Sequence, residues 1–398
     1  MSPPSTPSDA SPARDFAATS VALGGFYFFS FGALGAFFPF LPLLLAARGL
    51  GPQQIGWVMV LIPIGNLAVP PLWGLLADSL QARLALLRIA AVGAACTIFL
   101  FGPEWKIAGS MLAVGALSLF RAPLTSLADA TAAHELARTG GDFGRVRVWG
   151  SLGFGLFVLV VGLANASRHP WLLVAATAFA YLSAAASTLP LRKRPSAPSP
   201  SVLTHVGAIL VEPPILALLA ANAFHYVAHG AYDAFFSLHL HRIGFSDRFV
   251  GAAWMVGIAV EVCVMLLARA VLEHRSGAGV LALCSAVAAL RWILLSSLTS
   301  AIPILLTQTL HGITFGLWYL ALVRTIQQRA PDQLRTSLQA IAFAFVGLGM
   351  VVGYLAGGLL LGRFGGPALF QMGSVCAAIA SVLYLTSHRS RTRAIAAG

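Results

Sequence analysis

Charged residues are scarce in this 398-residue chain. Only 10% of its residues are Asp, Glu, Lys or Arg, whereas 58% are hydrophobic, and its mean hydropathy is +0.84. Soluble globular domains contain about 25% charged residues, so the composition excludes a soluble protein. Helices satisfy their own backbone hydrogen bonds in lipid. We therefore expect an all-α membrane protein whose chain crosses the lipid bilayer many times.

Cysteine is also rare, and its spacing excludes the common disulfide and metal patterns. The four cysteines lie in apolar stretches without a CxxC pair, at Cys96, Cys263, Cys284 and Cys376. Free cysteine in such surroundings packs as a small hydrophobic side chain. His225 and His229 have a spacing of four that suits metal ligation, but no third ligand accompanies them. The sequence thus predicts no metal site and no cofactor.

Catalytic motifs are missing as well. The chain has no HExxH or GxSxG motif and no pair of aspartates on facing helices, so we expect no enzymatic activity. The predicted tails, residues 1–16 and 389–398, are too short for a signalling domain, which argues against a sensor. The first of them is rich in Pro and Ser, and we expect it to be disordered.

Acidic residues are about half as frequent as basic ones, with 13 Asp and Glu against 25 Lys and Arg. Lys and Arg collect in the cytoplasmic loops of membrane proteins. Most of the basic residues fall in loops that share one side of the membrane with both termini. We therefore expect a multi-pass protein of the bacterial inner membrane, a plasma membrane, with cytoplasmic termini. Because the charges are distributed over many loops, we expect no nucleic-acid partner.

Long hydrophobic runs make up most of the chain. A helix of about 20 apolar residues spans the hydrocarbon core of a bilayer. Twelve such helices are predicted, at residues 17–45, 53–76, 84–101, 107–131, 143–165, 170–190, 213–241, 249–271, 279–297, 302–327, 334–361 and 367–388.

The first run, residues 17–45, has the composition of a cavity wall. It is rich in Phe, and Pro39 and Pro42 interrupt its helical hydrogen bonds near the end. Such an interruption is tolerated in lipid only where protein or a water-filled cavity covers it. We expect the aromatic side chains of this helix, Tyr27 and Phe31 among them, to face a cavity.

The chain divides into two halves at residues 191–212, a polar segment rich in Pro and Ser that we interpret as a cytoplasmic linker. Residues 17–190 and 213–388 then form two six-helix bundles. The bundles are related by a weak repeat, in which Gly49 and Gly56 correspond to Gly244 and Gly251. Parallel repeats of this kind build transporters that bind substrate between the halves near the middle of the bilayer.

Asp129 and Arg147 are ionisable residues within apolar runs of the first half. A buried charge costs several kcal/mol unless it is paired or faces water, so each is a candidate functional residue. The guanidinium group of Arg147 can bind a carboxylate or neighbouring hydroxyls with two hydrogen bonds. The alternative is a structural salt bridge between the two residues. Arg121 either lies near the cavity or pairs with Asp129.

Four ionisable residues lie on four different helices of the second half: Asp233, Glu261, Arg291 and His311. Proton relays in membrane proteins consist of such sets of acids and bases. The alternative is a charge-balanced core that holds the bundle together.

A short motif lies between the second and third predicted helices, where Gly74 and Asp78 are followed by Arg83. An aspartate at a helix end beside an arginine can hold one helix against its neighbour and release it when the protein changes conformation. The alternative is an ordinary solvated turn.

The Gly74 to Arg83 segment resembles the loop motif of the major facilitator superfamily. Within that superfamily the chain is similar to the phenylpropionate permease family, which is related to the lactose permease branch. The resemblance covers most of the chain and depends on Glu261, Arg291 and the runs 37–42, 54–56, 70–74, 142–151 and 308–316. It implies two pseudo-symmetric six-helix bundles and proton-coupled symport.

The same resemblance implies roles for individual residues. Asp129 and Arg147 resemble the acid and the arginine that hold substrate in the lactose permease. Glu261 resembles its essential substrate-binding acid, and Arg291 and His311 match its arginine and histidine. This chain has Thr314 in place of the proton-carrying acid and Gln308 in place of a lysine. The proton would then be carried by Glu261, Asp233 or His311.

These patterns together predict a monomeric secondary transporter that works by alternating access. We expect proton-coupled symport of an aromatic or other small carboxylate, bound by arginine while Tyr27, Phe31 or Trp149 packs on its apolar part. Its partners would be the small-molecule substrate, protons and the lipid bilayer. Symport of a sugar or nucleoside, and efflux of amphipathic compounds by proton antiport, remain open alternatives.

Overall fold

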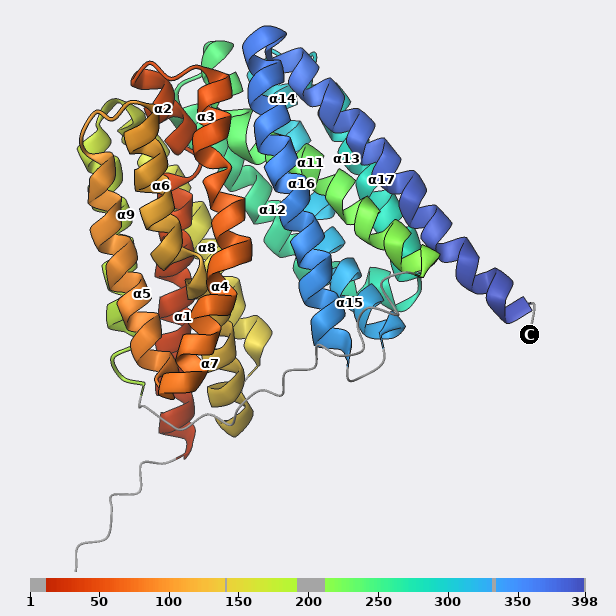
Figure 1. The fold of residues 1–398 in the computed structure, drawn as a ribbon, viewed down its shortest axis with the longest axis horizontal. Coiled ribbons are helices and arrows are strands. Elements are labelled where there is room, and N and C mark those ends of the chain that lie inside the picture. Colours follow the sequence, from red (N-terminus) through yellow and green to blue (C-terminus); the bar gives the residue numbers. More distant parts are fainter. Residues whose placement is uncertain (1–11, 140–141, 192–211, 331–333, 397–398) are drawn as a thin grey trace, which may run out of the picture.

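The computed structural model describes residues 12–139, 142–191, 212–330 and 334–396, which form helices and connecting loops without a strand (Figure 1). The helices of the first half are α1 Pro12–Phe37, α2 Leu41–Ala47, α3 Pro52–Met59, α4 Leu61–Leu80, α5 Arg83–Thr97, η1 Ile98–Phe101, α6 Ile107–Arg121, α7 Pro123–Thr139, α8 Phe143–Leu163, η2 Ala166–Arg168 and α9 Pro170–Ser187. Those of the second half are α11 Pro213–Arg242, α12 Asp247–Glu273, α13 Gly277–Leu295, α14 Ala301–Gln308, η3 Gly312–Leu317, α15 Trp318–Arg329, α16 Arg335–Arg363 and α17 Gly365–Ala396.

Ten helical segments of the described chain are long and apolar enough to cross a membrane. The other two of the twelve predicted segments correspond to α11 and to the series α14, η3 and α15. Helix α11 carries buried polar side chains such as Asn222 and His225, which lower its hydropathy. The all-α, multi-pass architecture expected from the sequence is confirmed.

The predicted segment ends differ from the observed helices in places. Helix α1 begins at Pro12, inside the predicted disordered tail, while residues 1–11 lie outside the described part. Nearly all of the predicted linker, residues 192–211, also lies outside it. Helix α17 continues to Ala396, through most of the predicted tail at 389–398.

Proline marks several interruptions within the predicted membrane segments. Helix α1 ends at Phe37 and α2 begins at Leu41, so that the interruption falls around Pro39 as expected. Helix α6 ends at Arg121, and Pro123 opens α7. Because proline lacks a backbone N–H, it is favoured in the first turn of a helix; α4 nevertheless carries Pro70 and Pro71 in its interior.

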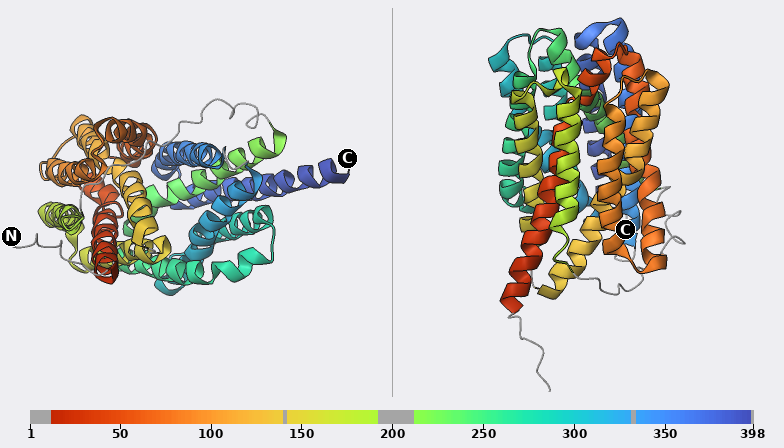
Figure 2. Two further views of the ribbon diagram at one scale, coloured as in Figure 1. Left: turned by 90° about the horizontal axis from the view of Figure 1, so that it is seen from below. Right: turned by 90° about the vertical axis from the view of Figure 1, so that its left-hand side faces the viewer.

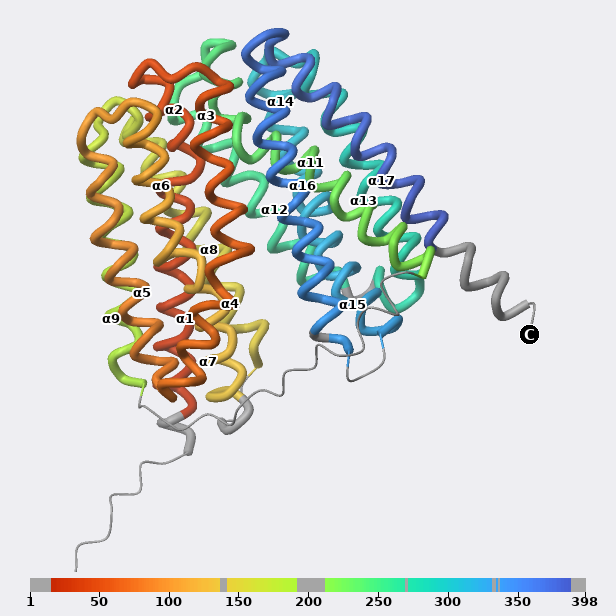
Figure 3. Tube along the Cα trace, in the orientation of Figure 1, coloured from red at the N-terminus to blue at the C-terminus, as the bar shows by residue number. Residues whose placement is uncertain are grey.

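The two bundles contact each other at one end of the molecule, near α2, α3 and α14, and diverge toward the end that carries α7 and α15 (Figure 1). Viewed along the bundles they lie side by side (Figure 2). The Cα trace shows that several helices of the second half are inclined relative to those of the first (Figure 3).

Glycines allow this contact. A Cβ atom added to Gly162 on α8 would lie 2.7 Å from the backbone oxygen of Asp247, and one added to Gly56 on α3 would lie 2.6 Å from that of Tyr354 on α16. Small residues let helices approach closely in membranes. The backbone N–H of Ser167 also donates a 2.9 Å hydrogen bond to Oδ2 of Asp247 across the two halves.

Candidate functional site

A cavity of about 280 Å³ lies between the two bundles. From the first half it is lined by Phe31, Leu34, Phe38, Pro39, Met59, Ile62, Asn66, Arg121, Arg147, Ser151 and Phe154. From the second half it is lined by Asp233, Trp254, Ile258, Glu261, His311, Phe315, Met350 and Tyr354. Its charges are segregated, because both arginines belong to the first half and both carboxyl groups to the second.

Arg147 on α8 faces the cavity with its guanidinium group 4.0 Å from the centre of the Phe31 ring and 5.5 Å from that of Tyr27. It forms no hydrogen bond or ion pair with any residue that the structure describes. The hydroxyl of Tyr27 instead donates a 2.6 Å hydrogen bond to Oδ1 of Asp129. The predicted alternative of an Asp129–Arg147 salt bridge is therefore not observed, and Arg147 keeps its donors free.

The aromatic residues predicted to contact substrate differ in their positions. Phe31 lines the cavity, whereas Tyr27 is fully buried beside Asp129 and does not line it. Trp149 is 49% exposed and packs against Gly24 and Phe28 on another face of α8. The expectations that Tyr27 and Trp149 face the cavity thus need correction. For Trp149 helical spacing gives the reason, because positions 147, 151 and 154 share the cavity face whereas position 149 points nearly the opposite way.

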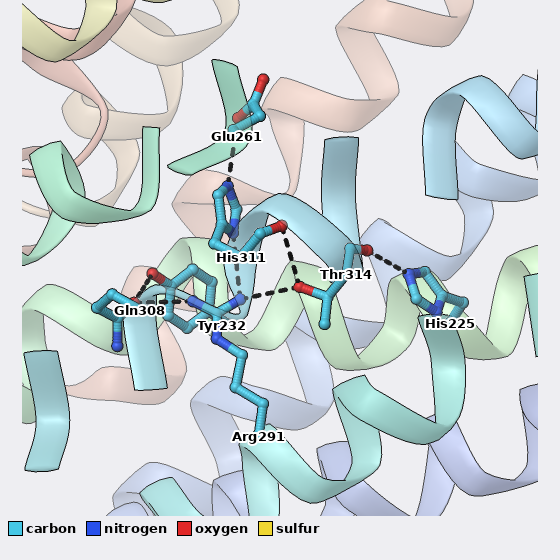
Figure 4. A network of polar contacts seen from close by, with 7 residues as sticks. All are labelled: His225, Tyr232, Glu261, Arg291, Gln308, His311 and Thr314. Atoms are coloured by element: carbon cyan, nitrogen blue, oxygen red, sulfur yellow. Dashed lines mark hydrogen bonds and ion pairs between the residues drawn. The ribbon is translucent and has the colours of Figure 1, made fainter. Parts of the chain in front are cut away.

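Arg291 lies at the centre of a buried polar network in the second half (Figure 4). Its Nη1 donates to Nδ1 of His311 at 3.1 Å and to Oγ1 of Thr314 at 3.2 Å. Its Nη2 donates to Oε1 of Gln308 at 2.8 Å. The guanidinium carbon also lies 4.5 Å from the ring centre of Tyr232 and 4.6 Å from that of Trp292. These contacts stabilise a charge that has no exposure.

The network determines where His311 carries its proton. An arginine is only a donor, so Nδ1 of His311 must be the acceptor. The imidazole proton then lies on Nε2, which faces Oε2 of Glu261 at 3.6 Å. His311 is thus held as a neutral ring that presents an N–H group to the carboxylate of Glu261.

Gln308 and Thr314 are the residues at which the chain departs from the lactose permease pattern, and both are partners of Arg291. Oε1 of Gln308 also accepts a 2.8 Å hydrogen bond from the hydroxyl of Tyr232. Thr314 lies in the π-helical turn η3, a rare geometry that is frequent at functional sites. The carboxyl groups that remain on the cavity are those of Glu261 and Asp233. Asp233 has no hydrogen bond with a described residue.

Arg121 and Asn66 are polar cavity residues that the sequence analysis does not assign to the site. Of the two positions expected for Arg121, near the cavity or paired with Asp129, the structure shows the first, because Arg121 lines the cavity. Its guanidinium group donates to Oδ1 of Asn66 and lies 5.1 Å from the centre of the Phe38 ring. Asn66 was missed, although an amide within an apolar run is the signal that could have identified it.

Residues 20–372 match the sequence model of the MFS_1 like family. The chain belongs to the MFS_1 like family. It is 30% identical to the maltose permease of Geobacillus stearothermophilus over 92% of this chain and 94% of that protein. It is 27% identical to the probable 3-phenylpropionic acid transporter of Escherichia coli (strain K12), over 81% and 85% of the two chains.

The fold of this MFS_1 like protein is similar to the crystal structure of the nucleoside transporter NupG. The TM-score is 0.82 at 17% identity, and the match covers 93% of this chain and 99% of that one. The chain is therefore a multi-pass transporter of the major facilitator type and not an enzyme. The expected resemblance to this superfamily is confirmed.

The loop motif of this MFS_1 like transporter forms a local ion pair. Nη2 of Arg83 lies 3.3 Å from Oδ1 of Asp78, and the Asp78 side chain is 42% exposed. Gly74 faces open space. Both charged residues belong to the first half, so the predicted role of this loop in conformational switching stays a prediction.

His225 is a structural residue of the transporter core. Its Nδ1 lies 2.9 Å from Oγ of Ser285, its Nε2 lies 3.1 Å from the backbone oxygen of Thr314, and its ring stacks on Trp318. The neighbouring His229 is buried next to it. Within the described ranges, no group of three His, Cys, Asp or Glu side chains is arranged to hold a metal ion.

Proposed function

We propose that this transporter carries out proton-coupled symport of a small aromatic carboxylate by alternating access. The observation that carries the proposal is the free guanidinium group of Arg147, which faces the cavity from the ring of Phe31. A charged group at membrane depth costs several kcal/mol unless it is paired or hydrated. A carboxylate offers two oxygens that match the two outer N–H groups of arginine.

Aromatic side chains near Arg147 suit the apolar part of such a substrate. Phe31 and Phe154 line the cavity from the first half, and Trp254 and Phe315 line it from the second. Ligand sites are lined mainly by apolar and aromatic side chains, with a few polar groups that fix orientation. A substrate held by Arg147 would therefore place its ring between the two bundles.

Glu261 is the residue that we propose as the proton carrier. Arg291 holds the neutral form of His311, and a second proton on Nδ1 would face the arginine that now donates to it. Glu261 is next to the Nε2–H group of His311 and borders the cavity. It can therefore take up and release a proton where substrate binds. Asp233 is the second carboxyl group in this position.

Charge balance supports the binding of one proton with one monoanion. Arg121, Arg147, Asp233 and Glu261 line the cavity, and Arg291 donates to His311, which also lines it. Asp129 interacts electrostatically with Arg147, so three arginines and three acids belong to this region. Protonation of one carboxyl group leaves one positive charge in excess, which a monocarboxylate neutralises. Because separated charges are costly in a membrane, each ligand would favour the binding of the other.

We also infer an inward-facing state in the bacterial inner membrane. The distribution of Lys and Arg favours cytoplasmic termini. The end where α8 packs on α12 and α3 on α16 would then be the outer end, closed in this conformation.

Uptake into proteoliposomes tests the proposal. Labelled 3-phenylpropionate should accumulate when an inward proton gradient is imposed and only equilibrate without one. Arg147→Gln should abolish this accumulation, whereas Arg145→Gln, an exposed position on the same helix, should leave it unchanged. Normal accumulation by the Arg147 variant would contradict the proposal.

A disaccharide is the second candidate substrate. The 30% identity with a maltose permease over nearly the whole chain favours it, and Asp233 and Glu261 offer acceptors for sugar hydroxyls. Labelled maltose and a nucleoside belong in the same assay. Proton-driven uptake of maltose, without uptake of the aromatic acid, would replace the first proposal with this one.

A further inference from the structure

Arg121 and Asn66 form a second polar cluster on the cavity, apart from Arg147. Arg121 ends α6 and Asn66 belongs to α4, so two helices of the first half bring these side chains together. The guanidinium group donates to Oδ1 of Asn66 and stacks over Phe38, and Nε of Arg121 is buried without a hydrogen-bond partner in the described chain. Neither residue has a carboxylate partner among the described residues.

The position of this cluster follows from a stripe of side chains that α1 and the next residue, Phe38, present to the cavity. The backbone N–H of Phe38 donates to the backbone oxygen of Leu34, which continues the helical spacing by one residue. Arg147 stacks on Phe31 and Arg121 stacks on Phe38, seven residues later. Seven residues of helix correspond to a rise of about 10 Å. Leu34 lies between the two rings on the same face and also lines the cavity. The cavity thus has a guanidinium group near each end of an apolar stripe.

The hydrogen-bonding capacity of the cluster is limited to donors. Arginine carries N–H groups only, and the side-chain oxygen of Asn66 accepts the hydrogen bond from Arg121. The amide NH₂ group of Asn66 and the outer N–H groups of Arg121 that do not bond Asn66 are then available, and both residues line the cavity. They are complementary to an oxygen atom with free lone pairs.

We propose that Arg121 and Asn66 form a second subsite, which binds an oxygen atom of the substrate at the end far from its carboxylate. The inference rests on the proposed function, since it assumes that Arg147 holds the carboxylate. It narrows the substrate class to aryl acids with a hydroxyl or carbonyl oxygen on the distal side of the ring. A second carboxylate fits less well, because a dianion exceeds the single positive charge that remains when one cavity carboxyl group is protonated.

The experiment compares 3-(4-hydroxyphenyl)propionate with 3-phenylpropionate, which lacks only the distal oxygen. A hydrogen bond to a charged group strengthens binding by about tenfold or more, so the wild type should show a KM lower by that factor for the hydroxylated acid. In Arg121→Gln the KM for both acids should rise, because the cavity loses a positive charge, and the ratio should fall close to one, because the distal oxygen loses its partner. Asn66→Ala should lower the ratio in part, and Arg168→Gln, at an exposed position on η2, should leave it unchanged.

The outcomes separate the proposed subsite from the proposed function. Uptake of both acids by the wild type with equal KM overturns the subsite and leaves the proposed function standing. An equal rise in both KM values in Arg121→Gln also overturns it, since Arg121 would then support the cavity as a whole. Uptake of neither acid overturns the proposed function and the subsite with it. If Arg121→Gln does not fold, as judged by gel filtration, the ratio in Asn66→Ala decides.

Discussion

The guanidinium group of Arg291 donates a hydrogen bond to Nδ1 of His311 over 3.1 Å, and in doing so fixes the single proton of that imidazole on Nε2. Nε2 faces Glu261, so a fully buried arginine that does not line the cavity sets which nitrogen of His311 carries the proton that points to Glu261.

Glu261→Gln should separate proton coupling from substrate movement. The glutamine oxygen can still face Nε2–H of His311, as Oε2 of Glu261 does at 3.6 Å, but the side chain cannot take up a proton. We expect loss of proton-driven accumulation, with exchange of labelled for unlabelled substrate retained. Glu212→Gln, at an exposed position before α11, is the control and should accumulate substrate normally. Full accumulation by the Glu261 variant would exclude it as the carrier.

Arg291→Lys should make transport sensitive to protonation of His311. An ammonium group cannot reproduce the planar set of hydrogen bonds to His311, Thr314 and Gln308. Without the donor at Nδ1, the imidazole is free to take a second proton and become cationic. Substrate exchange by this variant should fall as the pH is lowered from about 8 to about 6, and more steeply than in the wild type.

The control for this prediction is Arg88→Lys. Arg88 also donates several hydrogen bonds, to Thr188 and the backbone of Leu191, but lies away from the cavity. It should keep the wild-type pH profile. An unchanged profile in Arg291→Lys would show that His311 does not depend on the arginine for its neutral state.

Tyr27→Phe should weaken binding of the carboxylate. The hydroxyl of Tyr27 donates a hydrogen bond to the carboxylate of Asp129. Removal of this hydroxyl frees the carboxylate to interact with Arg147. We expect the KM for 3-phenylpropionate to rise roughly tenfold, within the range of a hydrogen bond to a charged group. Adding Asp129→Asn to Tyr27→Phe should restore the KM, because the competing negative charge is then gone. A double variant as weak as the single one would contradict this competition.

Gly162→Leu should favour the conformation in which the contacting ends of the bundles separate. A Cβ there would lie 2.7 Å from the backbone oxygen of Asp247 and 3.0 Å from Cα of Gly251. We expect slower uptake and faster labelling, by an impermeant maleimide added outside, of a cysteine placed at Ser151 on the cavity. The native cysteines are replaced by alanine for this measurement.

Gly115→Leu is the matched control, since a Cβ at this glycine meets no atom within 4 Å. It should label at the wild-type rate. Equal labelling of the Gly162 and Gly115 variants would mean that the glycine contact does not hold the bundles together.

Much of the architecture was predictable because the bilayer restricts the secondary structures that a chain can adopt within it. Backbone groups must be satisfied within each segment in lipid, so apolar runs of the required length become spanning helices. The high cost of intramembrane charge likewise singled out Arg147, Glu261 and His311, which all line the cavity. Hydropathy alone identifies α11 less clearly as a membrane-spanning helix, because its buried histidines lower the mean hydropathy of the segment.

The positions of side chains around a helix were predictable in part. The spacing of Arg147, Ser151 and Phe154 already identifies one face of α8, and the same spacing excludes Trp149 from it. Asn66 could have been predicted by the argument used for the buried charges. An amide within an apolar run also needs a hydrogen-bond partner or water.

The sequence by itself determined that this chain is a helical membrane protein with three arginines and three acids at membrane depth, since composition and the cost of burying charge are local properties. Only the tertiary structure decided which of these groups pair. Asp129 is bound by Tyr27, 102 residues away, and the proton of His311 is placed by Arg291 on another helix. Such partners are selected by the packing of helices that are distant in sequence, and a difference of one helical turn would select others.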